Sequence, residues 1–388
     1  MIETIGILGG GQLGRMLTLE AKWMGYRVVT LEPSADSPCG QVADDEIVAA
    51  YDDPAALTAL GARSDVVTYE FENIPLVSVA TLERDGHLVR PNGEVLRIAQ
   101  DRILEKTFVR GRGCATAEFA AVTNEPELLA ACERIGFPAA IKTVRGGYDG
   151  KGQWVVRSLE QARAALAAAG GRELIYEQFI PFERELSIIC VRNAQGESVA
   201  FPVTENVHVE GVLDTTIVPA RTSAGAAGRV REQALDIGAG LGIVGAYCVE
   251  FFEWRDGVFV NEIAPRVHNS GHYSLDAMQI SQYEAHVRAI CDLPLVEPRQ
   301  FAPAVMMNIL GAGAGDHLAG VAEMLRDPDV KLHMYGKTHA ALRRKMGHFT
   351  VLAPTIEEAL ERARAARAHL SWTEEPVRPA RTASAGSR

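Results

Sequence analysis

Two glutamates in the second half of the chain have a spacing that suits metal binding. Glu250 and Glu262 lie on the two arms of an expected hairpin whose loop is Arg-Asp-Gly. If all three residues form the loop, Trp254 pairs with Val258, and the two glutamates lie opposite each other on one face. Their Cβ atoms are then ~5 Å apart, a separation at which like charges repel. The pair predicts a hard cation, Mg²⁺ with Mn²⁺ as an alternative, that also contacts phosphate oxygens.

A solvated sheet face is the alternative for this hairpin, because long glutamate side chains can splay apart in water. The neighbours of the two glutamates are apolar, which favours a buried strand pair instead: Tyr247, Val249, Phe251, Val260 and Ile263.

A glycine-rich segment predicts a loop that covers phosphates. Residues 146–153 read Gly-Gly-Tyr-Asp-Gly-Lys-Gly-Gln and follow an expected strand that carries Lys142. With few Cβ atoms in the way, the amides of such a loop can approach a triphosphate closely. The segment is not a P-loop of the G-x-x-x-x-G-K-[ST] type, because no serine or threonine follows its lysine. A mobile hairpin is the alternative, but the charged residues of the loop favour a ligand.

An earlier glycine motif allows several interpretations. Gly9, Gly11 and Gly14 match G-x-G-x-x-G between an expected strand and helix, and Glu32 ends the next strand. Alone, this pattern indicates a dinucleotide-binding, NAD-dependent oxidoreductase. Amides at a helix N-terminus also hold any other anion or polar group, and a tight turn without a ligand is a further alternative.

The elements around these motifs indicate an α/β protein. In the first part, short apolar strands alternate with helices, which is typical of a parallel sheet; we expect strands at 4–8, 27–31 and 65–70 and a helix at 12–24. The second part is expected to contain helices at 99–110, 123–135, 159–169 and 226–241, and strands at 139–143, 153–156, 174–178 and 185–191. An antiparallel stretch at 198–221 and the hairpin at 247–263 complete it. The third part has strands at 304–309 and 331–335, a basic stretch at 337–345, and a helix at 355–369.

Composition limits the class of protein. The chain has 388 residues, 47% of them hydrophobic, enough for two or three cores. A net charge of -11 argues against nucleic-acid binding. The six cysteines are scattered, which excludes a zinc or redox motif and is typical of a reducing compartment. With no signal peptide and no long apolar run, we expect a cytoplasmic protein that does not bind membranes.

Several stretches together resemble the ATP-grasp superfamily, and within it the carboxylating synthases of bacterial purine biosynthesis. They are ILGGGQLGRM (7–16), VTYEFENIP (67–75), AQDRILEK (99–106), GGYDGKGQ (146–153), YEQFIPFERELS (176–187), NEIAPRVHNSGHYS (261–274), SQYEAHVRAI (281–290) and RKMGH (344–348). The resemblance implies an open parallel α/β domain at 1–95, an ATP-grasp domain at 96–297, a small β-rich domain at 298–373 and a disordered tail at 374–388.

The resemblance also implies an ATP site. Arg102 and Lys142 would contact the phosphates, and Glu250 and Glu262 would hold the metal. The loop that covers the phosphates would comprise Gly147, Tyr148, Asp149, Gly150, Lys151, Gly152 and Gln153. The adenine hinge would comprise Glu177, Gln178, Phe179 and Ile180, with Glu185 on the ribose and His208 and Asn261 facing the nucleotide.

The second substrate implied by the resemblance is 5-aminoimidazole ribonucleotide. It would be held by Gln12, Leu13, Glu70 and Asn269, with its phosphate on Lys337, Arg344 and Lys345. Between Lys337 and Arg344 the chain lacks the prolines and glycine expected of the family, although the spacing is kept. An exposed basic face is the alternative for this stretch.

The implied reaction is the activation of bicarbonate by ATP to carboxyphosphate, which the amine of the nucleotide then attacks. Arg266, His268 and Tyr148 would be catalytic; a buried structural histidine is the alternative for His268. The family implies a homodimer. Three other functions remain open. Two of them are a sister ligase that uses formate and glycinamide ribonucleotide, and the NAD-dependent oxidoreductase. A nucleotide sensor without catalysis is a third.

Overall fold

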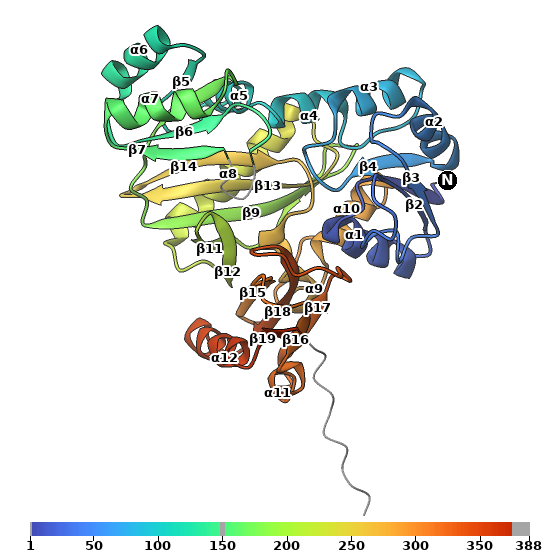
Figure 1. The fold of residues 1–388 in the computed structure, drawn as a ribbon. Helices are drawn as coiled ribbons and strands as arrows, with labels where there is room; N and C mark the ends of the chain where they lie inside the picture. The colour runs from blue at the N-terminus through green and yellow to red at the C-terminus, as the bar shows by residue number, and fades with distance from the viewer. Residues whose placement is uncertain (1, 148–151, 375–388) are drawn as a thin grey trace, which may run out of the picture.

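The computed structural model describes residues 2–147 and 152–374, and it begins with a parallel sheet (Figure 1). The strand order is β3 (Asp45–Val48), β2 (Arg27–Glu32), β1 (Thr4–Leu8), β4 (Val66–Tyr69), and every neighbouring pair is parallel. Helices α1 (Gln12–Trp23), α2 (Pro54–Arg63) and α3 (Leu76–Arg84) belong to this unit. The expected α/β class of the first part is confirmed. Strands β1, β2 and β4 are mostly buried because helices flank the sheet, whereas the edge strand β3 is partly exposed.

The predicted start of the helix at 99–110 is wrong. Helix α4 (Gly93–Ala99) ends there, and α5 (Arg102–Gly111) begins after a break. Asp101 is extended and its carboxylate accepts hydrogen bonds from the N–H groups of Ile103 and Leu104, which caps the new helix. The break places Arg102 in the first turn of α5.

A small antiparallel sheet follows, with two helices packed on it (Figure 1). Its order is β5 (Phe119–Val122), β8 (Leu174–Gln178), β6 (Ala139–Thr143), β7 (Gln153–Val156). Helices α6 (Glu125–Ile135) and α7 (Leu159–Ala168) share one apolar core with these strands. Three of the four strands have the bounds expected from the sequence, and β5 was not anticipated.

A larger sheet runs through the rest of the molecule. Its path is β14 (Gly257–Ala264), β13 (Gly245–Trp254), β9 (Arg184–Arg192), β11 (Thr204–Val209), β12 (Val212–Val218), β15 (Ala304–Leu310), β18 (Lys345–Leu352) and β17 (Val330–Met334), with β10 (Ser198–Ala200) beside β9. Helix α8 (Ala224–Leu241) packs near β13, α10 (Gln282–Ile290) lies between this sheet and α1, and α12 (Ile356–Ala368) packs on β15. The pairing of β12 with β15 makes one continuous sheet across the expected domain boundary at 297/298.

The shorter elements are η1 (Asn269–Gly271), α9 (Ser274–Ala277), β16 (His317–Ala319), α11 (Val321–Met324) and β19 (Ser371–Thr373). The tail expected to be disordered falls, from residue 375 on, outside the described residues. None of the helices in the described ranges is both long and apolar enough to cross a membrane.

The β13–β14 hairpin has the expected pairing of Glu250 with Glu262, but its register differs from the prediction near the loop. Trp254 pairs with Gly257, not with Val258, so the expected register at the loop is wrong. The register then shifts between Phe251 and Glu250, and beyond the shift Glu250 lies opposite Glu262 as expected. Asn261 is the extra residue of this β-bulge, and bulges re-aim side chains locally.

Candidate active site

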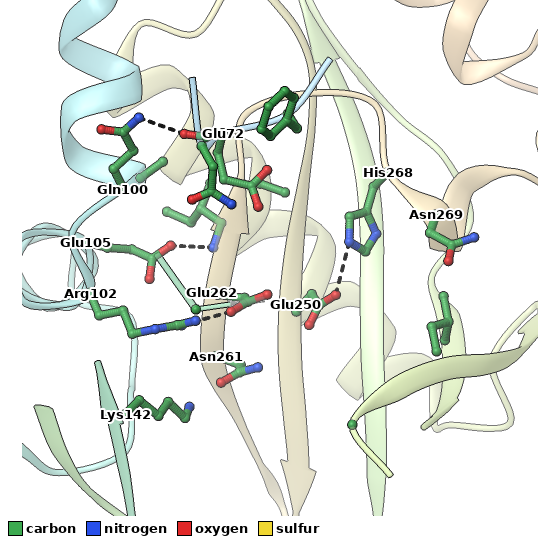
Figure 2. Close-up of a pocket in the computed structure, with 18 of the residues that line it drawn as sticks. Glu72, Gln100, Arg102, Glu105, Lys142, Glu250, Asn261, Glu262, His268 and Asn269 are labelled. Atoms are coloured by element: carbon green, nitrogen blue, oxygen red, sulfur yellow. Dashed lines mark hydrogen bonds and ion pairs between the residues drawn. The ribbon is translucent and has the colours of Figure 1, made fainter. Parts of the chain in front are cut away.

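A cavity of about 500 Å³ lies where the parallel-sheet unit, the small sheet and the large sheet meet (Figure 2). Many of the expected site residues line it: Gln12, Leu13, Arg102, Lys142, Gly147, Gly152, Gln153, Glu185, His208, Glu250, Asn261, Glu262, Arg266, His268, Asn269 and Lys345. Residues from distant parts of the sequence therefore converge on one site.

The two glutamates of the hairpin face each other in this cavity (Figure 2). The Glu262 side chain is 38% exposed and receives a hydrogen bond of 2.9 Å from Arg102 Nη1. Burial, followed by the charge of Glu262, raises the pKa of Glu250 to about 7. Burial also acts on Glu262, but the guanidinium of Arg102 outweighs it and lowers the pKa of that carboxyl. The pair thus carries negative charge that its protein neighbours only partly offset.

The donor set around the glutamates fits a hard divalent cation. Asn261, on the bulge, has a buried side-chain oxygen without a hydrogen-bond partner among the described residues. This oxygen and the two carboxylates are the kind of ligands that Mg²⁺ or Mn²⁺ takes. A cation would also reduce the repulsion between the glutamates.

A buried ion cluster lies beside the pair. Glu177 Oε2 is 2.7 Å from Lys142 Nζ, and its Oε1 is 3.2 Å from Lys106 Nζ. Burial would raise the pKa of Glu177, but the two lysines outweigh it and lower the value to about 2. Lys106 also donates to the backbone oxygen of Asn261 at 3.0 Å, so this cluster supports both Lys142 and the bulge.

The expected adenine hinge does not line the described cavity. The side chain of Glu177 is 4% exposed because the lysines hold it inside. The N–H groups of Gln178 and Phe179 donate to Glu118 O and Pro138 O. Ile180 is buried.

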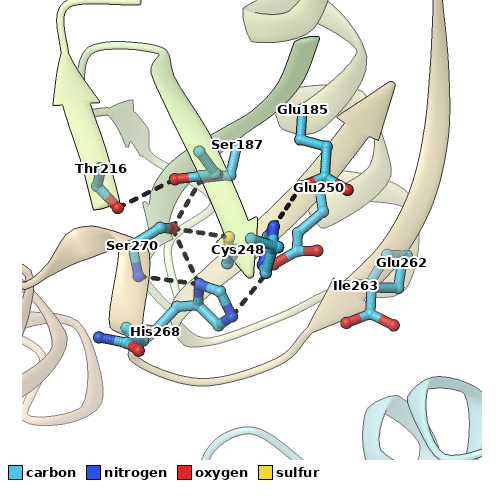
Figure 3. A network of polar contacts seen from close by, with 12 residues as sticks. Glu185, Ser187, Thr216, Cys248, Glu250, Glu262, Ile263, His268 and Ser270 are labelled. Atoms are coloured by element: carbon cyan, nitrogen blue, oxygen red, sulfur yellow. Dashed lines mark hydrogen bonds and ion pairs between the residues drawn. The ribbon is translucent and has the colours of Figure 1, made fainter. Parts of the chain in front are cut away.

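His268 is held in a polar network beneath the hairpin (Figure 3). Its Nδ1 lies 2.9 Å from Ser270 Oγ, which in turn accepts a hydrogen bond from Ser187. Its Nε2 lies 3.4 Å from Glu250 Oε1. Burial, reinforced by the charge of Arg266, lowers the pKa of His268 well below its usual value, so the ring is neutral at pH 7. The network fixes the ring against Glu250.

The pKa of His208 is shifted in the opposite direction, upward. Its Nδ1 pairs with Glu185, and both side chains line the cavity. Burial would lower the pKa of His208, but the hydrogen bond and charge of Glu185 outweigh it and raise the pKa.

Three functional candidates were missed from the sequence, although all of them fall within the quoted stretches. Glu72 binds Arg266 Nε at 2.5 Å and fixes its guanidinium beside the cavity. Glu105 accepts from Ile263 N at 2.5 Å, and burial followed by the charge of Glu262 raises its pKa to about 8. Lys106 is the third. The sequence pattern does not show which charged residues become buried or form ion pairs, so it could not identify these three.

The expected acceptor residues are only partly brought together. Gln12, Leu13, Asn269 and Lys345 line the cavity, whereas Glu70, Lys337 and Arg344 are not among its described lining residues. The amides of Asn269 and Asn308 bond each other at 2.8 and 3.1 Å. Lys337 Nζ donates to Lys345 O, and Arg344 donates to His339 O.

The first glycine turn is occupied by carboxylates of the chain itself. Glu70 accepts hydrogen bonds from Gly11 N at 2.5 Å and Gly14 N at 2.7 Å. Glu32 accepts from Gly10 N at 2.9 Å and from the Tyr51 hydroxyl at 2.5 Å. Glu32, the acid that would bind the ribose of a dinucleotide, therefore already accepts hydrogen bonds from the chain itself. Four other expected residues, Tyr148, Asp149, Gly150 and Lys151, lie outside the described residues.

Comparison with family models first defines the class of protein. Residues 2–100 match the ribonucleotide synthetase preATP-grasp domain, 107–283 match the ATP-grasp domain, and 304–362 match the phosphoribosylaminoimidazole carboxylase C-terminal domain. The expected ATP-grasp fold is confirmed.

Relatives and solved structures narrow the class to one family. The chain is 43% identical to the N5-carboxyaminoimidazole ribonucleotide synthase of Bacillus subtilis over 92% of this chain and 93% of the relative. It is 45% identical to that of Brucella melitensis over 91% and 97%. A crystal structure of an N5-carboxyaminoimidazole ribonucleotide synthetase with ADP has a TM-score of 0.89 at 44% identity, covering 94% and 96% of the two chains. An Aspergillus clavatus synthase in complex with ADP and 5-aminoimidazole ribonucleotide has a TM-score of 0.87 at 31% identity, covering 94% and 98%.

The chain belongs to the N5-carboxyaminoimidazole ribonucleotide synthase family, whose members are ATP-dependent carboxylate–amine ligases. The family expected from the sequence is confirmed.

Proposed function

We propose that the chain uses ATP and bicarbonate to carboxylate the exocyclic amine of 5-aminoimidazole ribonucleotide, with release of ADP and phosphate, in purine biosynthesis. The observation that carries this proposal is the facing pair Glu250 and Glu262 in a cavity that also presents Arg102 and Lys142. Relatives that align over nearly their whole length were solved with ADP and with this nucleotide, which supports the same substrates here.

The polyphosphate of ATP is assigned to the part of the cavity around Lys142 and Arg102. Both side chains are cationic and held by buried or partly buried carboxylates, so they are oriented before the nucleotide arrives. The loop at 147–153 is assigned as the cover over the phosphates, and 177–180 as the adenine hinge. Glu185, His208 and Asn261 complete the nucleotide site.

Glu250 and Glu262, with Asn261 beside them, would hold Mg²⁺. The ion, when bound, offsets negative charge on the phosphates during phosphoryl transfer. Mn²⁺ would suit the same hard oxygen donors.

The first chemical step joins a bicarbonate oxygen to the γ-phosphorus and breaks its bond to ADP. Arg266 is assigned to bind bicarbonate, because Glu72 holds its guanidinium in place beside the cavity. The product, carboxyphosphate, hydrolyses easily, so the site must exclude water. Closure of the glycine loop over the cavity would do this, and Tyr148 in that loop is assigned to position bicarbonate.

In the second step the amine nitrogen attacks the carboxyl carbon and phosphate leaves. We assign the relay of the amine proton to His268, whose ring lines the cavity next to Glu250. Gln12, Leu13, Glu70 and Asn269 would hold the nucleotide, and Lys337, Arg344 and Lys345 its phosphate. Among these cations, Lys345 is the one that lines the described cavity.

The test is ATP-dependent phosphate release by the purified chain. We expect release that requires both bicarbonate and 5-aminoimidazole ribonucleotide, with the carboxylated nucleotide as product. Release that instead required formate and glycinamide ribonucleotide would contradict the proposal, and so would substrate-independent release alone.

A homodimer in the cytoplasm is part of the proposal. The six cysteines are free, which suits a reducing compartment. Light scattering of the purified chain would give the mass of the assembly, and a monomeric mass would contradict the dimer.

A further inference from the structure

A second cluster of ligand-type side chains lies outside the catalytic cavity. It consists of Asp276 on α9, His333 on β17 and His348 on β18. A carboxylate oxygen and one ring nitrogen from each histidine all lie within 4.8 Å of one another. None of the three residues lines the cavity.

His348 supplies an observation that the proposed catalytic function does not explain. Its ring is fully buried, and its Nδ1 lies 2.8 Å from the Tyr335 hydroxyl. The other nitrogen, Nε2, is buried without a hydrogen-bond partner within residues 2–147 and 152–374. Buried polar atoms are nearly always paired, so such an atom indicates a missing partner.

His333 and Asp276 lie close enough to His348 to bind the same ligand. His333 Nε2 lies 2.9 Å from Asp276 Oδ2, and its ring stacks on His348 with centroids 4.7 Å apart and an interplanar angle of 16°. One ring nitrogen of each histidine lies within 4.8 Å of the other. The Tyr335 hydroxyl can accept from Nδ1–H of His348, which leaves the lone pair of Nε2 free, as metal-ligating histidines require.

We propose that Asp276, His333 and His348 bind a divalent transition-metal ion of the Zn²⁺, Co²⁺ or Ni²⁺ class. Two imidazoles and a carboxylate suit this class better than Mg²⁺, which prefers oxygen ligands alone. The ion takes the place of the hydrogen between His333 Nε2 and Asp276, and the neutral imidazole carries that hydrogen on Nδ1 instead. Water completes the coordination.

Small side-chain rotations close the site. Ligand atoms at zinc–nitrogen distances of about 2.1 Å and a tetrahedral angle are roughly 3.4 Å apart, and the three atoms start within 4.8 Å. His333 and Asp276 are both partly exposed, with side chains 31% and 12% accessible, so an ion can enter from that side.

The bound ion ties α9 to two strands of the large sheet. β18 also carries Lys345, which lines the catalytic cavity, but none of the three ligands lines that cavity. The site is independent of the proposed reaction.

The test is calorimetric titration of Zn²⁺ into the full chain, with excess Mg²⁺ present to occupy the oxygen ligands of the cavity. We expect about one equivalent bound per chain, and an affinity at least about tenfold lower in His333→Gln and in Asp276→Asn. His339→Gln is the matched control, because His339 forms an exposed pair with Asp316 at 3.0 Å. It should bind Zn²⁺ as the unsubstituted chain does.

Co²⁺ provides a second readout, since its visible absorption reports nitrogen ligands and low coordination number. The band should be present in the unsubstituted chain and in His339→Gln, and lost in His333→Gln. Equal Zn²⁺ affinity in the unsubstituted chain and His333→Gln would overturn the proposal, as would the absence of stoichiometric binding. Phosphate release should be unchanged in His333→Gln, which separates failure of this site from failure of the enzyme.

Discussion

Two regions of the molecule each hold a pair of carboxylates, and the negative charge of the two pairs is compensated differently. In the first glycine turn, Glu32 and Glu70 accept hydrogen bonds from three backbone N–H groups of the turn. In the β13–β14 hairpin, Glu250 and Glu262 face each other with Arg102 and His268 beside them. The turn is satisfied from within the chain, whereas the hairpin is left with negative charge for a cation to offset. A glycine motif therefore does not identify a ligand site until its hydrogen bonds are accounted for.

The largest effect is expected from removing one charge of the hairpin pair. Glu262→Gln should lower the rate of ATP-dependent phosphate release by about 10²–10³-fold or more, because a metal ligand at the transferring phosphate is lost. Asp256→Asn is the matched control, since this carboxylate lies on the exposed loop of the same hairpin. Equal rates for both variants would contradict a metal-binding role for the hairpin pair.

In the turn, the corresponding substitution should lower the stability of the chain, which is measured without the nucleotide. Glu70→Gln replaces a carboxylate that accepts two amide hydrogen bonds and places an NH₂ group against one of the donors. We expect the free energy of unfolding to fall by about 1–3 kcal/mol, measured by urea denaturation. Glu94→Gln, at an exposed residue paired with Arg97 on its own helix, should change it little. An unchanged stability in Glu70→Gln would mean that the turn does not depend on this carboxylate.

The pH dependence of stability should report the protonation of Glu250 in the hairpin pair. The pKa of Glu250 is about 7 in the folded chain against an ordinary value of 4.5 for glutamate, so the folded state binds the proton more tightly. Between these values, raising the pH should lower the free energy of unfolding in the absence of divalent cations, by at most about 1.4 kcal/mol per pH unit from this group. Glu105, with a pKa raised to about 8, acts in the same direction.

Mg²⁺ should reverse this loss of stability near pH 7.5, because it favours the ionised pair. The measurement is thermal unfolding at pH 5.5, 6.5 and 7.5 with and without Mg²⁺. Glu250→Gln should flatten the pH dependence and remove most of the Mg²⁺ effect. A profile of Glu250→Gln that matched the unsubstituted chain would assign the dependence to other groups.

The smallest effect is expected from a dinucleotide. Because the turn amides and Glu32 are already bonded, NADH should give no saturable fluorescence change at concentrations where ADP binds. Saturable NADH binding that ADP does not compete with would show that the turn opens for a ligand.

The regular elements of this fold follow from local sequence, and the departures have identifiable causes. Strands such as 139–143 and 174–178 are almost fully buried and each follows a helix, so their mainly apolar runs predict them well. The break before Arg102 depends on a single capping carboxylate, Asp101, within an otherwise helical pattern. The free-energy difference between a capped break and a continuous helix is small, and the hydrophobic pattern does not reveal it.

The hairpin shows how a correct pairing can come from a wrong register. The sequence predicts a three-residue loop, but the loop is shorter by one residue and Arg255 takes a positive φ of 52°. The bulge at Asn261 restores the missing offset, so the two errors cancel at Glu250 and Glu262. Glu72 and Lys106 were missed for a different reason: their partners, Arg266 and Glu177, are far away in the sequence, and only the tertiary fold brings them together.

The junction between β12 and β15 has a consequence for how the chain can be divided. Cutting the chain near residue 298 would strip β15 from its neighbour and leave the backbone donors and acceptors of β12 facing water. An uncovered strand of this kind recruits strands from other molecules and promotes aggregation. Strand β15 of the C-terminal part thus protects the edge of β12. A fragment that ends near residue 298 should therefore be insoluble rather than merely inactive.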